Sequence, residues 1–260
     1  MQNLHLRRLG AGPETVLALH CTLAHGGAWR GLAEGLEGQA EVLAPDMFCH
    51  GHSPDWTGGT DFLAAMVEAT LPVLERPMHV VGHSFGSVLA LALACAAPDK
   101  VKSLTMIESV FFAMALREAP ETVAAQDASE AITADAFAAQ DWPLAARLFN
   151  RAWSGTGPRW DDMPQRMRDA MIRGVQIVPP SGPGLRDDSQ GLIDQLDRIT
   201  MPMLLARGGA SQKVIAAAHD GLARHIPQAK QFVVPGAGHM LPITNPAPVA
   251  EAVSQLIRTA

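Results

Sequence analysis

Gly82-His83-Ser84-Phe85-Gly86 is the stretch of sequence that decides the fold. An apolar run, Met78 to Val81, precedes it, and a run of good helix formers, Ser87 to Cys95, follows it. A strand, a G-x-S-x-G turn and a helix in this order are typical of a nucleophile elbow. The sharp turn needs glycine where a Cβ would collide with a neighbouring strand or helix, and it places the serine hydroxyl at the positive end of the helix. The alternative is a plain strand-to-helix connection that happens to carry a serine.

The composition favours one α/β domain, or such a domain with an insertion. The chain has 260 residues, of which 48% are hydrophobic and 18% are charged, and this is enough to bury a substantial core. A net charge of −6 provides no electrostatic footprint for nucleic acid or for acidic membranes. The N-terminal residues 1–10 have no apolar run behind their charges, so no signal peptide is expected. The longest apolar run, Val88 to Ala97, is too short to cross a bilayer.

The cysteine count indicates a cellular compartment, and the tyrosine count excludes one kind of catalytic mechanism. The three cysteines are scattered along the chain and odd in number, which fits a reducing cytoplasm better than a disulfide framework. We therefore expect a cytoplasmic protein. The sequence contains no tyrosine, which excludes any mechanism that needs a phenol.

Apolar runs of strand length alternate with helical patterns along the chain. The expected strands are residues 15–19, 40–43, 78–81, 101–107, 201–206 and 231–234, with residues 4–8 as a candidate antiparallel edge strand. The expected helices are residues 27–36, 61–75, 85–96, 213–225 and 246–258. This alternation predicts a mostly parallel sheet with helices on both faces, whose catalytic groups gather at the carboxyl ends of the strands.

Residues 111–196 break the alternation. They contain helical patterns but no strand pattern, and a Pro- and Gly-rich run at residues 179–184 is expected to interrupt the helices. We interpret this segment as a helical lid inserted into a core formed by residues 1–110 and 197–260.

Three tryptophans of the expected lid, Trp142, Trp153 and Trp160, are candidates for the substrate pocket. The alternative is that each of them anchors the small helices of the lid itself. Sequence alone does not show which way an indole ring points.

An activated serine needs a base, and the base needs an acid that orients it. His239 follows the last expected strand, directly after Gly236-Ala237-Gly238. A loop histidine is often only solvated, but this one stands where a Ser-acid-His order along the chain requires the base. We therefore expect His239 to be the base for Ser84.

Three further segments carry a resemblance. They are His20-Cys21-Thr22 with the later Trp29, the loop from Ala44 to Ser53, and Gly236 to His239 with Asn245-Pro246. In these segments and in the elbow, the chain resembles the lid-bearing α/β-hydrolases, a family of esterases, cofactor-free haloperoxidases, haloalkane dehalogenases and carbon–carbon bond hydrolases. Cys21 and Cys49 stand where the family usually has glycine. The resemblance implies an α/β-hydrolase fold with a helical lid, and it makes Trp29 a further pocket candidate.

The resemblance also implies the oxyanion hole. One donor is the backbone N–H of Phe85, directly after the nucleophile, and the other is the backbone N–H of Thr22, in the turn after the strand that ends near His20. Each donor to an oxyanion lowers the barrier by roughly 3–4 kcal/mol.

The acid departs from the common pattern of the family. It usually lies in a Gly-x-x-Asp turn after the strand at residues 201–206, but that turn here ends in Ser211, and no Asp or Glu occurs between Asp197 and Asp220. Glu108 follows the strand at residues 101–107, and some haloalkane dehalogenases carry their acid there, after the sixth core strand. The resemblance therefore implies that Glu108 is the relocated acid. The alternative is that Glu108 caps the lid entrance or pairs with an arginine.

Other motifs are weaker. His50-Gly51-His52 has Pro54 where a metallo-hydrolase H-x-H-x-D-H run needs Asp, so no metal site is expected. Asp46 is interpreted as a structural hydrogen-bonding residue of its loop. The chain has neither G-x-G-x-x-G nor a P-loop. We expect no cofactor and no nucleic-acid or membrane partner.

The expected activity is hydrolysis of a small carboxylic ester, thioester or lactone by a Ser84–His239–Glu108 triad. Carbon–carbon bond hydrolysis and cofactor-free perhydrolysis use the same triad and remain alternatives. A serine at the elbow argues against a dehalogenase, which in this family uses aspartate there. A non-catalytic ligand-binding protein on a hydrolase scaffold is the alternative from another class.

Overall fold

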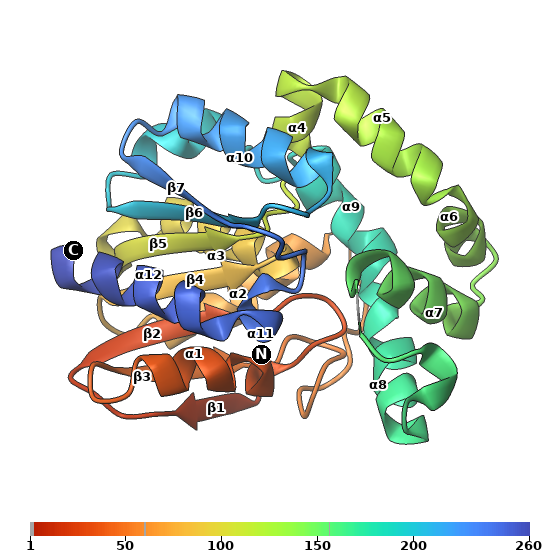
Figure 1. The fold of residues 1–260 in the computed structure, drawn as a ribbon, viewed down its shortest axis with the longest axis horizontal. Helices are drawn as coiled ribbons and strands as arrows, with labels where there is room; N and C mark the ends of the chain where they lie inside the picture. Colours follow the sequence, from red (N-terminus) through yellow and green to blue (C-terminus); the bar gives the residue numbers. More distant parts are fainter. Residues whose placement is uncertain (1–2, 60, 156) are drawn as a thin grey trace.

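A seven-stranded β-sheet forms the centre of the computed structural model, which describes residues 3–59, 61–155 and 157–260 (Figure 1). The strand order is β1-β3-β2-β4-β5-β6-β7. β1 pairs antiparallel to β3, and all other neighbours are parallel. The strands are β1 (Leu6–Leu9), β2 (Glu14–Leu19), β3 (Ala40–Pro45), β4 (Met78–His83), β5 (Val101–Ile107), β6 (Met203–Gly208) and β7 (Ala229–Val234). The predicted mostly parallel sheet with an antiparallel edge strand is therefore confirmed.

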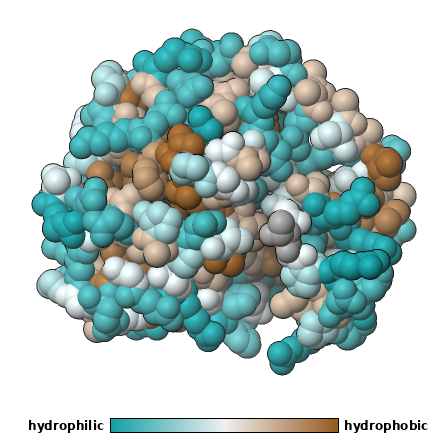
Figure 2. Space-filling view, viewed as in Figure 1, coloured by the Kyte–Doolittle hydropathy of each residue, from teal (hydrophilic) through white to brown (hydrophobic). Residues whose placement is uncertain are grey.

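Both faces of the sheet are buried, which explains why its strands read as continuous apolar runs. In β2, Val16 and Ala18 point into the core on one face, whereas Leu17 and Leu19 point into the core on the other. Figure 2 shows that the apolar side chains visible on the outside form separate patches among polar ones.

Helices cover the two faces as expected. The helices α1 (Arg30–Gly35) and α12 (Pro246–Thr259) pack on one face. The helices α2 (Phe62–Thr70), α3 (Phe85–Ala96) and α10 (Lys213–His225) pack on the other. The short helix α11 (Leu241–Thr244) precedes α12, and short 3-10 helices lie at Gly26–Trp29, Leu71–Val73, Pro98–Lys100, Trp160–Asp162, Val175–Ile177 and Ile193–Arg198.

The described part of residues 111–196 contains helices and no strand, and it connects β5 to β6. Its helices are α4 (Phe112–Glu118), α5 (Pro120–Ser129), α6 (Ala131–Ala138), α7 (Trp142–Trp153), α8 (Gln165–Gly174) and α9 (Val178–Arg186). In Figure 1 most of them lie beyond the carboxyl ends of the parallel strands. We call residues 111–196 the helical segment.

Two sequence-based expectations are corrected. The run at residues 179–184 does not interrupt a helix but forms most of α9, because Pro179 and Pro180 lie in its first turn, where backbone N–H groups have no helical partner. Glu108 follows the fifth strand in chain order and not the sixth, because the described chain forms only β1 ahead of β2.

Candidate active site

Ser84 lies at the turn between β4 and α3, where its backbone adopts a φ of 56° and a ψ of −120°. This is a region that residues with side chains rarely occupy. A Cβ on Gly82 would lie 2.1 Å from the carbonyl oxygen of Gly86, and a Cβ on Gly86 would lie 2.2 Å from that of Leu19. The two glycines therefore allow the strand and the helix to approach closely enough to form the turn.

His239 brings the three predicted catalytic side chains together. It lies in the loop between β7 and α11. Its Nε2 is 3.0 Å from Ser84 Oγ, and its Nδ1 is 3.2 Å from Glu108 Oε2. Because Nδ1 faces a carboxylate, it carries the proton of the neutral ring, and Nε2 is left as the acceptor toward the serine hydroxyl.

Glu108 is fully buried just after β5, with a left-handed φ of 53°. Burial alone raises the pKa of its carboxyl. Hydrogen bonds from His239, Ser211 Oγ and the Gly208 backbone N–H outweigh that effect, so the pKa lies below its usual value. Glu108 therefore presents a carboxylate, and not a neutral acid, to His239.

Ser211 lies beside the acid and does not replace it. Its hydroxyl donates a 2.6 Å hydrogen bond to Glu108 Oε1, while Oε2 faces His239. In the sequence, position 211 is notable only because the family's usual acid is absent there. The contact between Ser211 and Glu108 could have been inferred, because the two residues follow adjacent parallel strands, β6 and β5, whose carboxyl ends meet at one edge of the sheet.

The turn after β2 carries the predicted oxyanion donor Thr22. In the described part of the chain, neither Thr22 N–H nor Phe85 N–H donates to a backbone acceptor. The next residue, Leu23, has a left-handed φ of 67°, and its N–H donates a 3.0 Å hydrogen bond to His50 Nε2. His50 thus holds the turn in a conformation that its non-glycine sequence disfavours.

His20 and His50 were missed as positioning residues. His20 Nε2 accepts from the Met47 N–H at 2.9 Å, and its Nδ1–H donates to the carbonyl of Cys21 at 2.8 Å. His50 Nδ1–H donates to Phe48 at 2.8 Å. Each ring is therefore a neutral tautomer that uses both nitrogens. The only sign of this in the sequence is that both histidines belong to segments that resemble the family's motifs.

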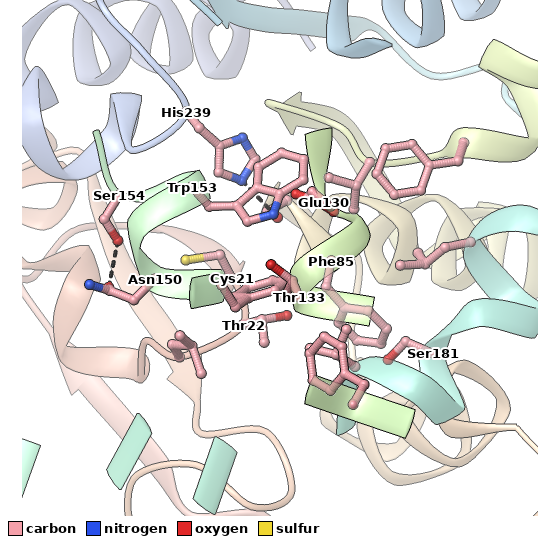
Figure 3. A pocket seen from close by; sticks show the side chains of 18 of the residues that line it. Cys21, Thr22, Phe85, Glu130, Thr133, Asn150, Trp153, Ser154, Ser181 and His239 are labelled. Atoms are coloured by element: carbon pink, nitrogen blue, oxygen red, sulfur yellow. Dashed lines mark hydrogen bonds between the residues drawn. The ribbon is translucent and has the colours of Figure 1, made fainter. Parts of the chain in front are cut away.

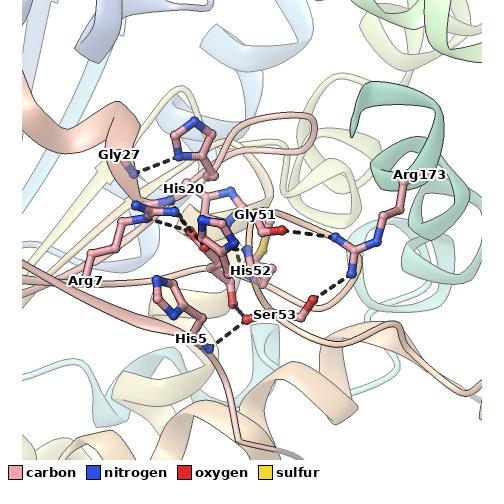
Figure 4. A network of polar contacts seen from close by, with 12 residues as sticks. His5, Arg7, His20, Gly27, Gly51, His52, Ser53 and Arg173 are labelled. Carbon is pink, nitrogen blue, oxygen red and sulfur yellow. Dashed lines mark hydrogen bonds and ion pairs between the residues drawn. The ribbon is translucent and has the colours of Figure 1, made fainter. Parts of the chain in front are cut away.

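Asp46 and Arg173 extend this network (Figure 4). The fully buried Asp46 carboxylate accepts from Gly26 N–H at 2.7 Å and His52 N–H at 2.8 Å, and it pairs with Arg7 at 3.2 Å. Arg173, on α8, donates to the backbone carbonyl of Ser53 at 2.6 Å. The network joins the turn after β2, the loop after β3 and the helical segment. No group of three His, Cys, Asp or Glu suited to a metal ion occurs among the described residues.

Acid is expected to unfold the protein through its buried histidines. Burial lowers the pKa of His20 and His83 to about 3, and that of His50 and His219 to about 4. The unfolded chain takes up these four protons near pH 6.5, but the folded chain does not. The free energy of unfolding therefore decreases as the pH is lowered below about 6.5. For four sites the decrease is up to about 5 kcal/mol per pH unit. We therefore expect the protein to unfold between pH 4 and 6.

Urea unfolding followed by circular dichroism at pH 7, 6 and 5 measures this slope. His219→Gln keeps an acceptor for the Ser109 N–H but does not titrate, so it should reduce the slope by about one proton. The exposed His5→Gln is the matched control and should leave the slope unchanged. A free energy of unfolding that is constant from pH 7 to 5 would contradict the prediction.

Besides Ser84 and Glu108, the side chains of His83 and Trp153 lie against His239. His83 Nε2–H donates a 2.7 Å hydrogen bond to the backbone carbonyl of His239, and the two ring centroids are 5.3 Å apart. The indole of Trp153 meets the His239 ring edge-on at 4.6 Å between centroids. Residue 83 was not singled out in the sequence, although it belongs to the elbow. Its hydrogen bond positions the loop that carries the base.

A cavity of about 380 Å³ opens next to Ser84 and His239 (Figure 3). Its lining includes both predicted oxyanion residues, Thr22 and Phe85, and at least one residue from each of the helices α4 to α9. Most of the lining is apolar. The cavity therefore lies between the catalytic side chains and the helical segment.

Of the four tryptophans predicted for the pocket, only Trp153 lines this cavity. Trp142 and Trp160 pack against a small cluster within the helical segment that includes Ala145. Trp29 packs into the core that α1 and α12 cover. These three indoles lie outside the lining of this cavity, because Trp142 and Trp160 pack within the helical segment and Trp29 packs into the core beside the sheet.

Comparison with known proteins places the chain in a family. The alpha/beta hydrolase fold profile matches residues 14–246. Pimeloyl-[acyl-carrier protein] methyl ester esterase of Nitrosomonas europaea is 27% identical over 241 residues, which cover 92% of this chain and 93% of that protein. Lipase LipV of Mycobacterium tuberculosis is 39% identical over 114 residues, which cover only 41% of each chain. The solved esterase EaEST of Exiguobacterium antarcticum shares the fold, with a TM-score of 0.75 at 18% identity over 98% of this chain and 95% of that one.

The chain thus belongs to the alpha/beta hydrolase fold family, and it is a hydrolase. The resemblance seen in its motifs is confirmed. Over the residues that the structure describes, no helix has the length and apolar character needed to span a bilayer.

Proposed function

We propose that this hydrolase cleaves a small carboxylic ester, thioester or lactone through an acyl-enzyme formed on Ser84. The observation that carries the proposal is the chain of contacts from Ser84 Oγ through His239 to the ionised Glu108. The esterase and the lipase among the similar proteins support an ester as substrate.

In the first half of the proposed reaction, Ser84 Oγ attacks the carbonyl carbon while His239 Nε2 takes the hydroxyl proton. Glu108 holds the imidazole in the required tautomer and stabilises the imidazolium that forms. The backbone N–H groups of Thr22 and Phe85 donate to the oxyanion. His239 then gives its proton to the leaving alcohol, the bond from acyl carbon to alcohol oxygen breaks, and the acyl group stays on Ser84.

In the second half, water attacks the acyl-enzyme. His239 takes a proton from the water, the tetrahedral intermediate forms at the same oxyanion site, and Ser84 leaves with the proton returned by His239. The carboxylic acid and the free enzyme result.

We also propose that the helical segment acts as a lid over the small-molecule substrate. It supplies residues from α4 to α9 to the cavity wall, so its packing decides which substrates fit. A closed lid excludes bulk water from the oxyanion site and strengthens the hydrogen bonds there.

Labelling with a fluorophosphonate probe tests the proposal, because only an activated serine reacts at a useful rate. We expect labelling at Ser84 together with turnover of p-nitrophenyl butyrate. Absence of both would favour the non-catalytic ligand-binding alternative. Labelling without turnover of any ester, thioester or lactone would favour carbon–carbon bond hydrolysis or perhydrolysis, which use the same triad.

Trp153→Ala is expected to change the order in which the enzyme prefers esters of different chain length, because it enlarges the cavity beside His239. Trp142→Ala is the matched control, since Trp142 lies on the same helix but is not among the residues that line the cavity. The measurement is kcat/KM for a series of p-nitrophenyl esters from acetate to octanoate. An unchanged order in Trp153→Ala would show that this indole does not shape the pocket.

A further inference from the structure

The cavity contains a buried hydrogen-bond donor that the described protein does not satisfy. Trp153 is 7% exposed, and its indole Nε1–H has no hydrogen-bond partner among the described residues. A buried polar group without a partner destabilises the structure, because it has lost its hydrogen bonds to water and gained none in return. Such a donor on the wall of a substrate cavity therefore points to an acceptor on the ligand.

A carboxyl group lies close to this donor. Glu130 precedes α6 at its N-cap position, but its side chain makes no capping hydrogen bond and lines the cavity instead. Gln126 Nε2 donates to Glu130 Oε1 at 2.9 Å, which leaves Oε2 for another donor. Burial raises the pKa of the Glu130 carboxyl, while the nearby indole of Trp153 acts in the opposite direction. The indole is thus near this carboxyl without a well-formed hydrogen bond to it.

A hydroxyl group stands next to the carboxyl. Thr133 is buried on the first turn of α6, three residues after Glu130, and it also lines the cavity. Residues three apart on a helix lie on the same side. Figure 3 shows Glu130, Trp153 and Thr133 among the side chains that line the cavity.

The position of Trp153 fixes which part of the substrate these groups meet. The indole packs edge-on against the ring of His239. In the proposed reaction His239 hands its proton to the leaving alcohol, so the alcohol must lie beside this ring. Polar groups next to Trp153 therefore face the alcohol part of an ester.

We propose that Glu130, Trp153 and Thr133 form a subsite for a second hydroxyl group on the alcohol part of the substrate, so that the preferred substrates are monoesters of a diol or polyol. A hydroxyl group both donates and accepts. It can donate to Glu130 Oε2 and accept from Trp153 Nε1–H, whereas an alkyl chain leaves both groups unsatisfied. This inference rests on the proposed ester hydrolysis.

The test compares 2-hydroxyethyl butyrate with propyl butyrate, which differ only by a hydroxyl in place of a terminal methyl group. We expect kcat/KM to be at least about tenfold higher for the hydroxyethyl ester, because the propyl ester leaves the buried indole N–H of Trp153 without a partner. Trp153→Phe, Thr133→Val and Glu130→Leu should each move this ratio toward one. Glu121→Gln, an exposed carboxylate on α5, is the matched control and should keep the wild-type ratio.

The outcomes separate the inference from the proposed function. Hydrolysis of both esters with a wild-type ratio near one overturns the hydroxyl subsite alone, and so does a high ratio that persists in all three variants. If the variants slow both esters equally, the three groups hold the attacking water and not the alcohol, which also overturns the inference. If the wild-type enzyme hydrolyses neither these esters nor p-nitrophenyl butyrate, the proposed function itself is wrong. Thr133→Val is nearly isosteric, so it keeps the test decisive if Trp153→Phe does not fold.

Discussion

Ser84→Ala is expected to lower kcat for ester hydrolysis by about 10⁶-fold, as removal of the nucleophile does in other serine triads. Ser84 Oγ lies 3.0 Å from His239 Nε2, the nitrogen that takes its proton in the proposed reaction. Without it, no acyl-enzyme forms, and only the binding and oxyanion groups remain. The measurement is turnover of p-nitrophenyl butyrate, together with thermal unfolding to show that the fold survives.

Ser129→Ala is a suitable control for this substitution. Its hydroxyl is exposed and bonds only to the Gln126 carbonyl in the described structure, far along the chain from the elbow. It should retain the wild-type kcat. A Ser84→Ala protein that is folded and still turns over the ester near the wild-type rate would remove Ser84 from the mechanism.

Glu108→Gln is expected to lower kcat by up to about 10⁴-fold. The Ser211 hydroxyl and the Gly208 N–H both donate to Oε1, so the amide oxygen of glutamine will take that side. Its NH₂ group then faces His239 Nδ1 as a donor where the carboxylate was an acceptor. This favours the wrong tautomer of His239 and leaves Nε2 protonated toward Ser84.

Two substitutions of Ser211 test the assignment of Glu108 as the acid. Ser211→Ala removes one donor to the carboxylate but no charge, so we expect a loss in kcat of less than about tenfold. Ser211→Asp in the Glu108→Gln background should restore part of the activity, because it places a carboxylate next to residue 108. In the wild-type protein Ser211 Oγ is 2.6 Å from Glu108 Oε1. The assignment of the acid fails if Glu108→Gln stays within a few-fold of wild type, or if Ser211→Ala is the more damaging change.

The sheet could be predicted from the sequence because its strands are short apolar runs and most of them are separated by helical patterns. Burial on both faces makes such runs conspicuous, as in β4 and β5. The meeting of Ser84, Glu108 and His239 could also be predicted, since all three follow strands whose carboxyl ends share one edge of the sheet. The structure places these three side chains within hydrogen-bonding distance of one another at this edge.

The cavity could not be predicted in the same way. Trp142 and Trp153 stand at the two ends of α7 and on nearly the same face of the helix, so which indole reaches the cavity depends on which end of α7 lies beside it. The hydrogen bonds of His20 and His50 were hidden for another reason. They join loops that are distant in sequence, and each ring binds backbone groups, which carry no residue identity for a pattern to record.

The contact between Ser211 and Glu108 has a consequence for how the position of the catalytic acid can evolve. Two neighbouring strand ends can each deliver a negative charge to the same imidazole. A chain with carboxyl groups at both positions would hold them close enough to share one proton, so that the pair would still carry a single negative charge near neutral pH. Such a chain would keep a carboxylate beside the imidazole while the acid moved from one strand end to the next.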